Sequence, residues 1–309
     1  MDAVLDLFER CEQLTDADSI VKERRVARYL SAGELTDDVH HAIGGRDSHG
    51  VLRGFGMATA LAGTETVLRA ELRAVIDPSW RNRGIGRALL DWQDGRARQL
   101  LAEDGRDLPV SIETRVDSHN TEQRRLVAAA GFSPVRKVEE HTRTIEAGEK
   151  FVDPVIDAQL GAADVKIISF DKDLSEEVRV VRNRTETLSR GGRVLRRRDF
   201  ERRVAMIDES MSFLAITDED SPIVVGFLLA GLRYGGEGAW IEFAGVERAW
   251  RSKGIGDALM AYHFDAVADK GLTLSSLEID SGWEPGLASW FTSWDFFPRT
   301  TDIVYAIEV

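Results

Sequence analysis

The chain has 309 residues, about twice the length of a common domain, so we expect two domains. Its net charge of −13 argues against general affinity for nucleic acid or an anionic membrane surface. Cys11 is the single cysteine, which excludes an intramolecular disulfide and a cysteine cage around zinc, and no metal is expected. Residues 1–14 are acidic and amphipathic, unlike a secretory signal, and no apolar run could span a bilayer, which predicts a cytoplasmic protein.

The chain contains an internal repeat, because four landmarks recur in the same order. The apolar run that begins at Gly54 returns at Gly226, and the glycine pair that begins at Gly84 returns at Gly254. The strand pattern PVSIETRV returns as LSSLEID, and the segment AAAGF returns as SWDFF. The separation between the copies decreases slowly along the chain, as loops of different length would produce. We infer a tandem duplication.

The repeat predicts two domains of the same α/β (α+β) class. We assign residues 1–147 to the N-terminal domain, residues 148–162 to a linker rich in charge, and residues 163–309 to the C-terminal domain. Within each copy, a helical part precedes β-rich runs, and the third run (TVLRAELRAVI or AWIEFAGV) ends at a glycine-containing loop. An amphipathic helix, a strand, a short helix and a closing β stretch follow.

The loops at 81–86 and 251–256 have the composition of an anion site. Glycine permits backbone torsions that other residues avoid, and the free amides of the following helix point at one spot. Basic residues in both loops favour a phosphate or diphosphate. A dinucleotide fingerprint is excluded because Leu89 and Leu259 stand where it requires a third glycine. A Gly-x-Gly pattern alone fits a tight turn without a ligand as well as it fits a phosphate-binding loop.

The sequence pattern of the loops is more specific when the end of the preceding strand is included. The segments IDPSWRNRGIG and VERAWRSKGIG resemble motif A of the GNAT superfamily of N-acyltransferases. The resemblance implies two tandem GNAT folds, each a mixed, mainly antiparallel sheet splayed at the strand before the loop, with helices on both faces. In this family the loop binds the diphosphate of acetyl-CoA, and the strand edge pairs with the pantetheine arm. The two-copy arrangement resembles tandem actinobacterial acetyltransferases of the mycothiol synthase type.

The resemblance also assigns cosubstrate-binding residues in both copies. They are Ile76, Arg81, Asn82, Arg83, Gly84, Ile85, Gly86 and Arg87 in the first copy, and Val246, Arg251, Ser252, Lys253, Gly254, Ile255 and Gly256 in the second. The second copy has Asp257 where the first has Arg87, so we expect the first copy to bind the cosubstrate better. An aspartate in the first turn also suits the helix dipole without any ligand.

A general base is expected on the strand before the loop. Counting back by twos from Val246 places Ala244, Glu242 and Trp240 on one face, and Glu242 is the candidate base. The same count in the first copy yields no carboxylate on that face. A bulge would shift this parity. The alternative is that Glu242 is a salt-bridged carboxylate on a half-exposed strand.

The tyrosine that often protonates the departing thiolate in this family is missing from both copies. Val127 and Phe291 occupy its position. Ser289, Ser293 and Tyr262 are the alternatives in the second copy, and a thiolate is also a tolerable leaving group without an acid.

These features predict an acetyl-CoA-dependent N-acetyltransferase, with catalysis in the second copy by direct attack of a primary amine in a ternary complex. The acceptor is a small-molecule or peptide amine. A non-catalytic acyl-CoA-binding protein with two degenerate domains is the alternative, and catalysis in the first copy is a third possibility. The basic segment 179–203 fits a solvated helix face or an acceptor pocket. No oligomeric state is favoured.

Overall fold

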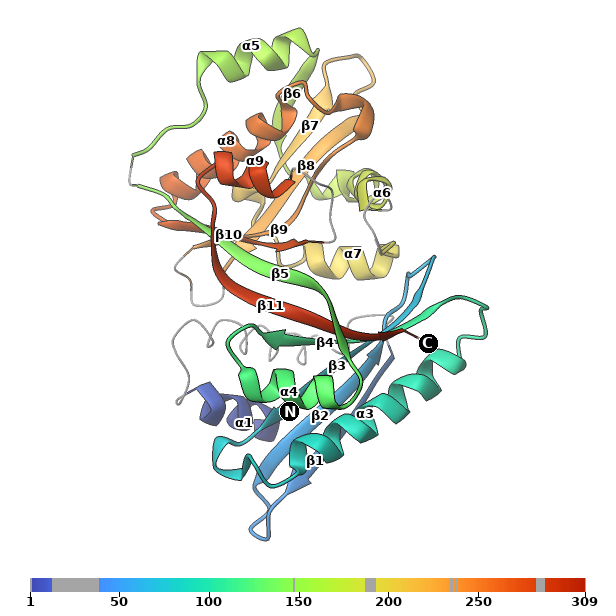
Figure 1. Cartoon of the computed structure of the whole chain (residues 1–309). Coiled ribbons are helices and arrows are strands. Elements are labelled where there is room, and N and C mark those ends of the chain that lie inside the picture. The colour runs from blue at the N-terminus through green and yellow to red at the C-terminus, as the bar shows by residue number, and fades with distance from the viewer. Residues whose placement is uncertain are drawn as a thin grey trace. The chain divides into compact units, whose positions relative to one another are not determined.

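The computed structural model describes residues 2–12, 39–146, 148–186, 193–233, 236, 238–281 and 287–308. The chain divides into two compact units (Figure 1). Unit 1 comprises Met1–Glu139 and Thr300–Val309, and unit 2 comprises Glu140–Arg299. Each unit has a mixed sheet with helices on both faces, which confirms the predicted fold class.

The sheet of unit 1 has the order β1-β2-β3-β4-β11, and only the β3–β4 pair in this series is parallel. Leu72 of β3 packs toward the long helix α3, whereas Val75 packs toward α1 on the opposite face. The elements are α1 (Asp2–Glu12), β1 (Val39–Arg46), β2 (Leu52–Ala60), β3 (Leu68–Ile76), η1 (Pro78–Trp80), α3 (Ile85–Ala102), β4 (Val110–Asp117), α4 (Thr121–Ala129) and β11 (Phe297–Glu308). Strand β5 (Ser133–Thr144) begins in unit 1 and ends in unit 2.

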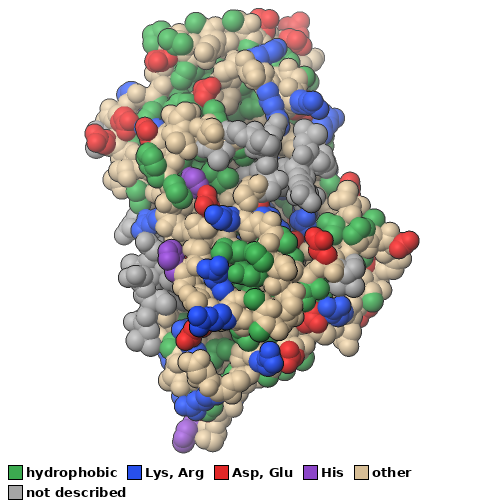
Figure 2. Space-filling view, in the orientation of Figure 1, with side chains coloured by type: hydrophobic (Ala, Val, Ile, Leu, Met, Phe, Trp, Pro, Cys, Tyr) green, Lys and Arg blue, Asp and Glu red, His purple; other side chains and the backbone are tan. Residues whose placement is uncertain are grey.

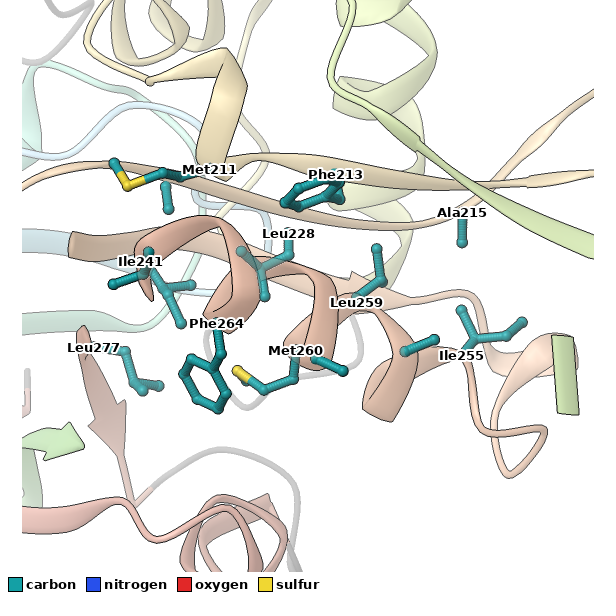
Figure 3. Close-up of a cluster of buried hydrophobic side chains, with 14 of the residues drawn as sticks. Met211, Phe213, Ala215, Leu228, Ile241, Ile255, Leu259, Met260, Phe264 and Leu277 are labelled. Carbon is teal, nitrogen blue, oxygen red and sulfur yellow. The ribbon is translucent and has the colours of Figure 1, made fainter. Parts of the chain in front are cut away.

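The sheet of unit 2 has the order β5-β10-β9-β8-β7-β6. Helix α8 covers one face with Leu259, Met260 and Phe264 (Figure 3), and α6 and α7 cover the other. The elements of its chain are α5 (Pro154–Ala162), β6 (Val165–Ser169), η2 (Lys172–Leu174), α6 (Ser175–Glu186), α7 (Arg197–Val204), η3 (Glu209–Met211), β7 (Phe213–Thr217), β8 (Val224–Leu232), β9 (Ala239–Val246), η4 (Arg248–Trp250), α8 (Ile255–Asp269), β10 (Leu274–Asp280) and α9 (Leu287–Ser293).

The two repeats exchange their closing strands. Residues 302–308 of β11 pair with β4, and Tyr305 is buried in the core of unit 1. Conversely, Ile145 lies in the core of unit 2. The Arg143 guanidinium lies 4.6 Å from the centre of the Phe151 ring and 4.7 Å from that of the Phe264 ring. The compact units therefore differ from the expected ranges 1–147 and 163–309, because each closing stretch completes the other unit's core.

The expected linker, residues 148–162, is partly helical. Asp153 caps α5 by accepting hydrogen bonds from the amides of Val155 and Ile156, and Pro154 occupies the first helical turn. Ile156 and Leu160 are buried in the core of unit 2. This packing, together with the cap, explains why the segment folds.

The strand before each glycine loop separates from its parallel neighbour. In unit 1 the pairing of β3 with β4 ends at Leu72 and Thr114, although β3 continues to Ile76. In unit 2 the pairing of β9 with β10 ends at Trp240 and Ser276. The predicted splay is therefore present in both units, and the backbone beyond it has an open edge.

None of the described helices is long and apolar enough to cross a membrane. On the face shown in Figure 2, the described acidic and basic side chains are interspersed.

His263 of α8 is completely buried beneath β7 and β10. Its Nδ1 lies 2.9 Å from the Met211 carbonyl oxygen and its Nε2 lies 2.9 Å from Ser275 Oγ. Because a carbonyl only accepts, Nδ1 carries the proton and Nε2 accepts from the serine hydroxyl. Burial lowers the pKa of His263 to about 4, against the opposing effect of the bond to Met211. The imidazole is neutral in the folded protein.

We expect unit 2 to lose stability as the pH falls from 7 to 5. His263 takes up a proton in the unfolded chain near its ordinary pKa of 6.5 but not in the folded chain, which costs about 2 kcal/mol of unfolding free energy. His263→Gln introduces the residue that the first copy has at the matching position, Gln93. Urea unfolding at both pH values should show a smaller loss in the variant; equal losses would contradict this role.

Candidate functional site

Both glycine loops have the same backbone shape. Asn82 and Ser252 have φ values of 60° and 61°, and Gly84 and Gly254, the N-caps of α3 and α8, have φ values of 80° and 78°. Alternating left-handed positions turn successive amides toward one point, where the dipole of the helix adds positive potential. Neither N-cap has a side-chain hydrogen bond, so the first amides of both helices lack that partner. This geometry suits a phosphate.

The first arginine of each loop ties the loop to its strand. Arg81 Nε donates to the carbonyl oxygen of Ile76 at 3.4 Å, and Arg251 Nε donates to that of Val246 at 3.1 Å. The strand ends Ile76 and Val246 are thereby held next to the loops.

The second basic residue of each loop stacks on a tryptophan. The Arg83 guanidinium lies 4.7 Å from the centre of the Trp80 ring, and Lys253 Nζ lies 4.3 Å from that of Trp250. Stacking over an aromatic ring restricts a long cationic side chain while leaving its charge near the loop. These tryptophans were not predicted as site residues, although each directly precedes the first arginine of its loop in the sequence.

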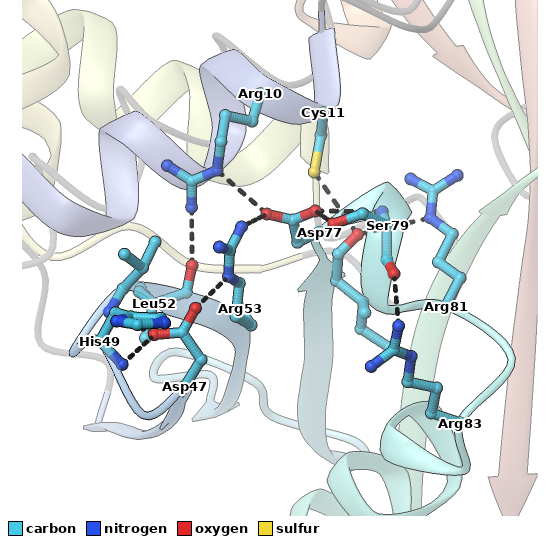
Figure 4. A network of polar contacts seen from close by, with 12 residues as sticks. Arg10, Cys11, Asp47, His49, Leu52, Arg53, Asp77, Ser79, Arg81 and Arg83 are labelled. Carbon is cyan, nitrogen blue, oxygen red and sulfur yellow. Dashed lines mark hydrogen bonds and ion pairs between the residues drawn. The ribbon is translucent and has the colours of Figure 1, made fainter.

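A buried carboxylate supports the loop of unit 1 (Figure 4). Asp77 accepts hydrogen bonds from Arg10 of α1 at 3.1 Å, from Arg53 of β2 at 2.7 Å, and from the amide and hydroxyl of Ser79. Burial alone would raise the pKa of Asp77, but these hydrogen bonds outweigh it and hold the pKa far below its usual range. The corresponding Glu247 provides no side-chain cap to η4 and pairs with the exposed Arg184.

The two loops differ in what surrounds them. Among the described residues, no atom of another element lies within 4 Å of the position that a Cβ on Gly84 would take, whereas a Cβ on Gly254 would overlap Gln159 of α5. Arg87 is exposed in the first turn of α3. Asp257, at the matching position of α8, accepts hydrogen bonds from the indoles of Trp290 and Trp294 at 2.8 and 2.9 Å. The loop of unit 2 is therefore more enclosed and less positive.

Glu242 lies on a bulge in β9. Leu229 of β8 pairs with Phe243 and the next residue pairs with Ile241, so Glu242 is the extra residue of the strand. Ile241 packs toward α8 and Phe243 toward α7, which means that the faces exchange at the bulge. Glu242 lies on the side of α7, where Arg203 Nη1 donates to its Oε1 at 3.1 Å.

The matching strand of unit 1 has no bulge. Met57 pairs with Arg73 and Ala58 with Leu72, so β3 contains no counterpart of Glu242. The nearest carboxylate on this strand, Glu71, accepts a hydrogen bond from Arg73 at 3.0 Å. The alternation expected for β9 was thus interrupted by one inserted residue, whereas that of β3 is regular.

Val127 and Phe291, at the position of the missing tyrosine, are both buried in hydrophobic cores. Tyr262 packs edge-on against Phe213 at 5.7 Å, and burial followed by the charges of Asp157 and Asp265 raises its pKa. Tyr262 therefore packs against the hydrophobic core beneath α8, close to α5. Among the described residues, no group of three His, Cys, Asp or Glu side chains could hold a metal ion.

The sequence of the chain is similar to those of known acetyltransferases. Residues 180–286 match the acetyltransferase (GNAT) family. A mycothiol acetyltransferase of Clavibacter michiganensis is 29% identical over 239 residues, which cover 76% of this chain and 71% of the relative. One from Clavibacter sepedonicus is 28% identical over 232 residues, or 75% and 70% of the two chains.

Two solved structures have a similar fold. A GCN5-related N-acetyltransferase from Sphaerobacter thermophilus has a TM-score of 0.67 at 20% identity, covering 93% of this chain and 85% of its own. A tandem GNAT protein from the clavulanic acid biosynthesis pathway has a TM-score of 0.63 at 15% identity, covering 99% and 94%.

The fold of the chain is similar to that of solved GNAT structures, a tandem GNAT protein among them. This chain carries a GNAT-family acetyltransferase domain, and over most of its length it is similar to mycothiol acetyltransferases.

We expect Asp77→Asn to destabilise unit 1 by about 3 kcal/mol, because two arginines would lose a buried carboxylate partner. The matched change Glu247→Gln should cost less than about 1 kcal/mol, since its partner Arg184 is 67% exposed. Chemical unfolding of both variants tests the difference, and equal losses would show that Asp77 does not anchor the loop.

Proposed function

We propose that the chain is an acetyl-CoA-dependent N-acetyltransferase that acts on a primary amine of a small molecule or peptide, with catalysis in unit 2. The observation that carries this proposal is the position of Glu242. It stands on a bulge two residues beyond the last β9–β10 pair, at the beginning of the open strand edge. That edge is the place where a pantetheine arm would pair with the backbone, so the carboxylate would lie beside the thioester.

Glu242 would act as general base. The amine nitrogen forms a bond to the thioester carbonyl carbon, and its proton passes to Glu242 directly or through a water molecule. The carbon–sulfur bond then breaks, which yields the acetamide and the thiolate of CoA. Backbone amides at the open edge of β9 are available to stabilise the oxyanion. The thiolate needs no phenol to leave, which is compatible with the buried Phe291.

Both loops would hold the diphosphate, with unequal affinity. The unit 1 site comprises the loop of Gly84, its arginines and an open approach to that glycine. In unit 2, Gln159 and the Asp257 carboxylate lie beside the corresponding loop. Unit 1 would therefore bind acetyl-CoA tightly but has no general base. Unit 2 would bind acetyl-CoA more weakly and has a general base.

We expect Glu242→Gln to lower kcat for acetyl transfer by about 100-fold or more, because the variant cannot accept the amine proton. The matched control is Glu71→Gln on β3, which should leave kcat within about twofold, since its carboxylate pairs with Arg73. CoA release with a panel of primary amines provides the measurement. Equal rates for Glu242→Gln and the wild type would remove Glu242 from the mechanism.

Gly84→Glu and Gly254→Glu separate binding from turnover. A carboxylate in either loop repels a diphosphate, so we expect Gly84→Glu to abolish the tighter calorimetric binding of acetyl-CoA and to preserve turnover. Gly254→Glu should abolish turnover and preserve the tighter binding. The reversed pattern would place catalysis in unit 1.

A non-catalytic acyl-CoA-binding protein is the second candidate, and the apolar residues Val127 and Phe291 favour it. Tight binding of acetyl-CoA without CoA release for any amine of a broad panel would support this alternative and would exclude the enzyme.

A further inference from the structure

We propose that Arg203 of α7 is the positioning residue for Glu242, and this inference rests on the proposed role of Glu242 as general base. The charge-assisted bond between Arg203 Nη1 and Glu242 Oε1, at 3.1 Å, joins a helix of one face to the bulged strand.

The bulge creates the geometry that Arg203 uses. It places two consecutive residues, Glu242 and Phe243, on the side of α7. Arg203 contacts both of them, because its guanidinium also lies 5.6 Å from the centre of the Phe243 ring. A planar guanidinium held by a ring and a carboxylate has few other orientations.

The ring itself is rigidly held. Phe243 is 8% exposed and stacks on Phe200 at 5.8 Å, with the Arg182 guanidinium 5.4 Å from its centre. Phe200 and Val204, the neighbours of Arg203 on α7, are buried in the same cluster. Arg203 is therefore supported by tightly packed side chains, so the Glu242 carboxylate that it contacts has a defined position.

The ion pair occupies only one of the two oxygens of the Glu242 carboxylate. Arg203 engages Oε1, and within the described part of the chain Oε2 accepts no hydrogen bond. The side chains of Arg203 and Glu242 are 29% and 28% exposed, so an acceptor amine or a bridging water can reach Oε2. One oxygen is used for orientation and the other remains for proton transfer.

A purely structural role for Arg203 is the competing explanation. Arg203 and Arg202 both lie in the last turn of α7, where a basic residue interacts favourably with the helix dipole. Under that explanation, loss of Arg203 would lower stability and would act independently of Glu242.

The test is a double-mutant cycle between Arg203 and Glu242. We expect Arg203→Met to lower kcat by about 10- to 100-fold because the base is no longer held in register, with little change in KM for acetyl-CoA. Arg203→Lys should recover part of kcat, and millimolar guanidinium should partly rescue Arg203→Ala. In a Glu242→Gln background, Arg203→Met should change kcat by less than about twofold.

Arg202→Met, on the same turn, is the matched control and should retain wild-type kcat. The inference is overturned if Arg203→Met behaves like this control, or if its effect on kcat is the same in both backgrounds while the melting temperature falls. The proposed function fails separately if Glu242→Gln keeps the wild-type rate. Absence of transfer to any amine by the wild type would remove both.

Discussion

The interruption of hydrogen bonding between two parallel strands is the constraint on which the functional region depends. In each unit the pair is joined near its beginning and separated near the glycine loop, at Leu72 in unit 1 and after Trp240 in unit 2. Buried backbone groups require partners, so an open strand edge is stable only where solvent or a ligand reaches it. The loop, the bulge and the arginine that contacts Glu242 all lie at or beyond this point.

Much of the fold was accessible from the sequence because local chemistry and long-range packing agree. The paired glycines predicted sharp turns into helices, and Gly84 and Gly254 have the left-handed torsions that such turns require. Helix α5 was missed although Asp153 and Pro154 form a recognisable N-terminal signal. Their position in a charged, proline-containing stretch made a linker the simpler interpretation.

The bulge and the exchange of strands were less accessible, for different physical reasons. The alternation of apolar and polar residues does not reveal a single inserted residue in a strand. The insertion becomes visible only in the strand pairing, where Ile241 of β9 matches Leu72 of β3 and one further residue follows in β9. The closing stretches around Ile145 and Tyr305 have β patterns that would satisfy either unit. Which sheet each joins depends on tertiary packing, and pattern analysis does not contain that information. The same limit applies to Asp257, whose two indole donors come from α9 and from the turn that follows it.

The crossing of β11 into unit 1 has a consequence for synthesis on the ribosome. The segment that supplies Tyr305 and pairs with β4 emerges after all of unit 2. Domains commonly fold in the order in which they are translated. Here the order of folding is inverted relative to the order of translation. The sheet of unit 1 stays incomplete, with one side of β4 unpartnered, until unit 2 has been translated.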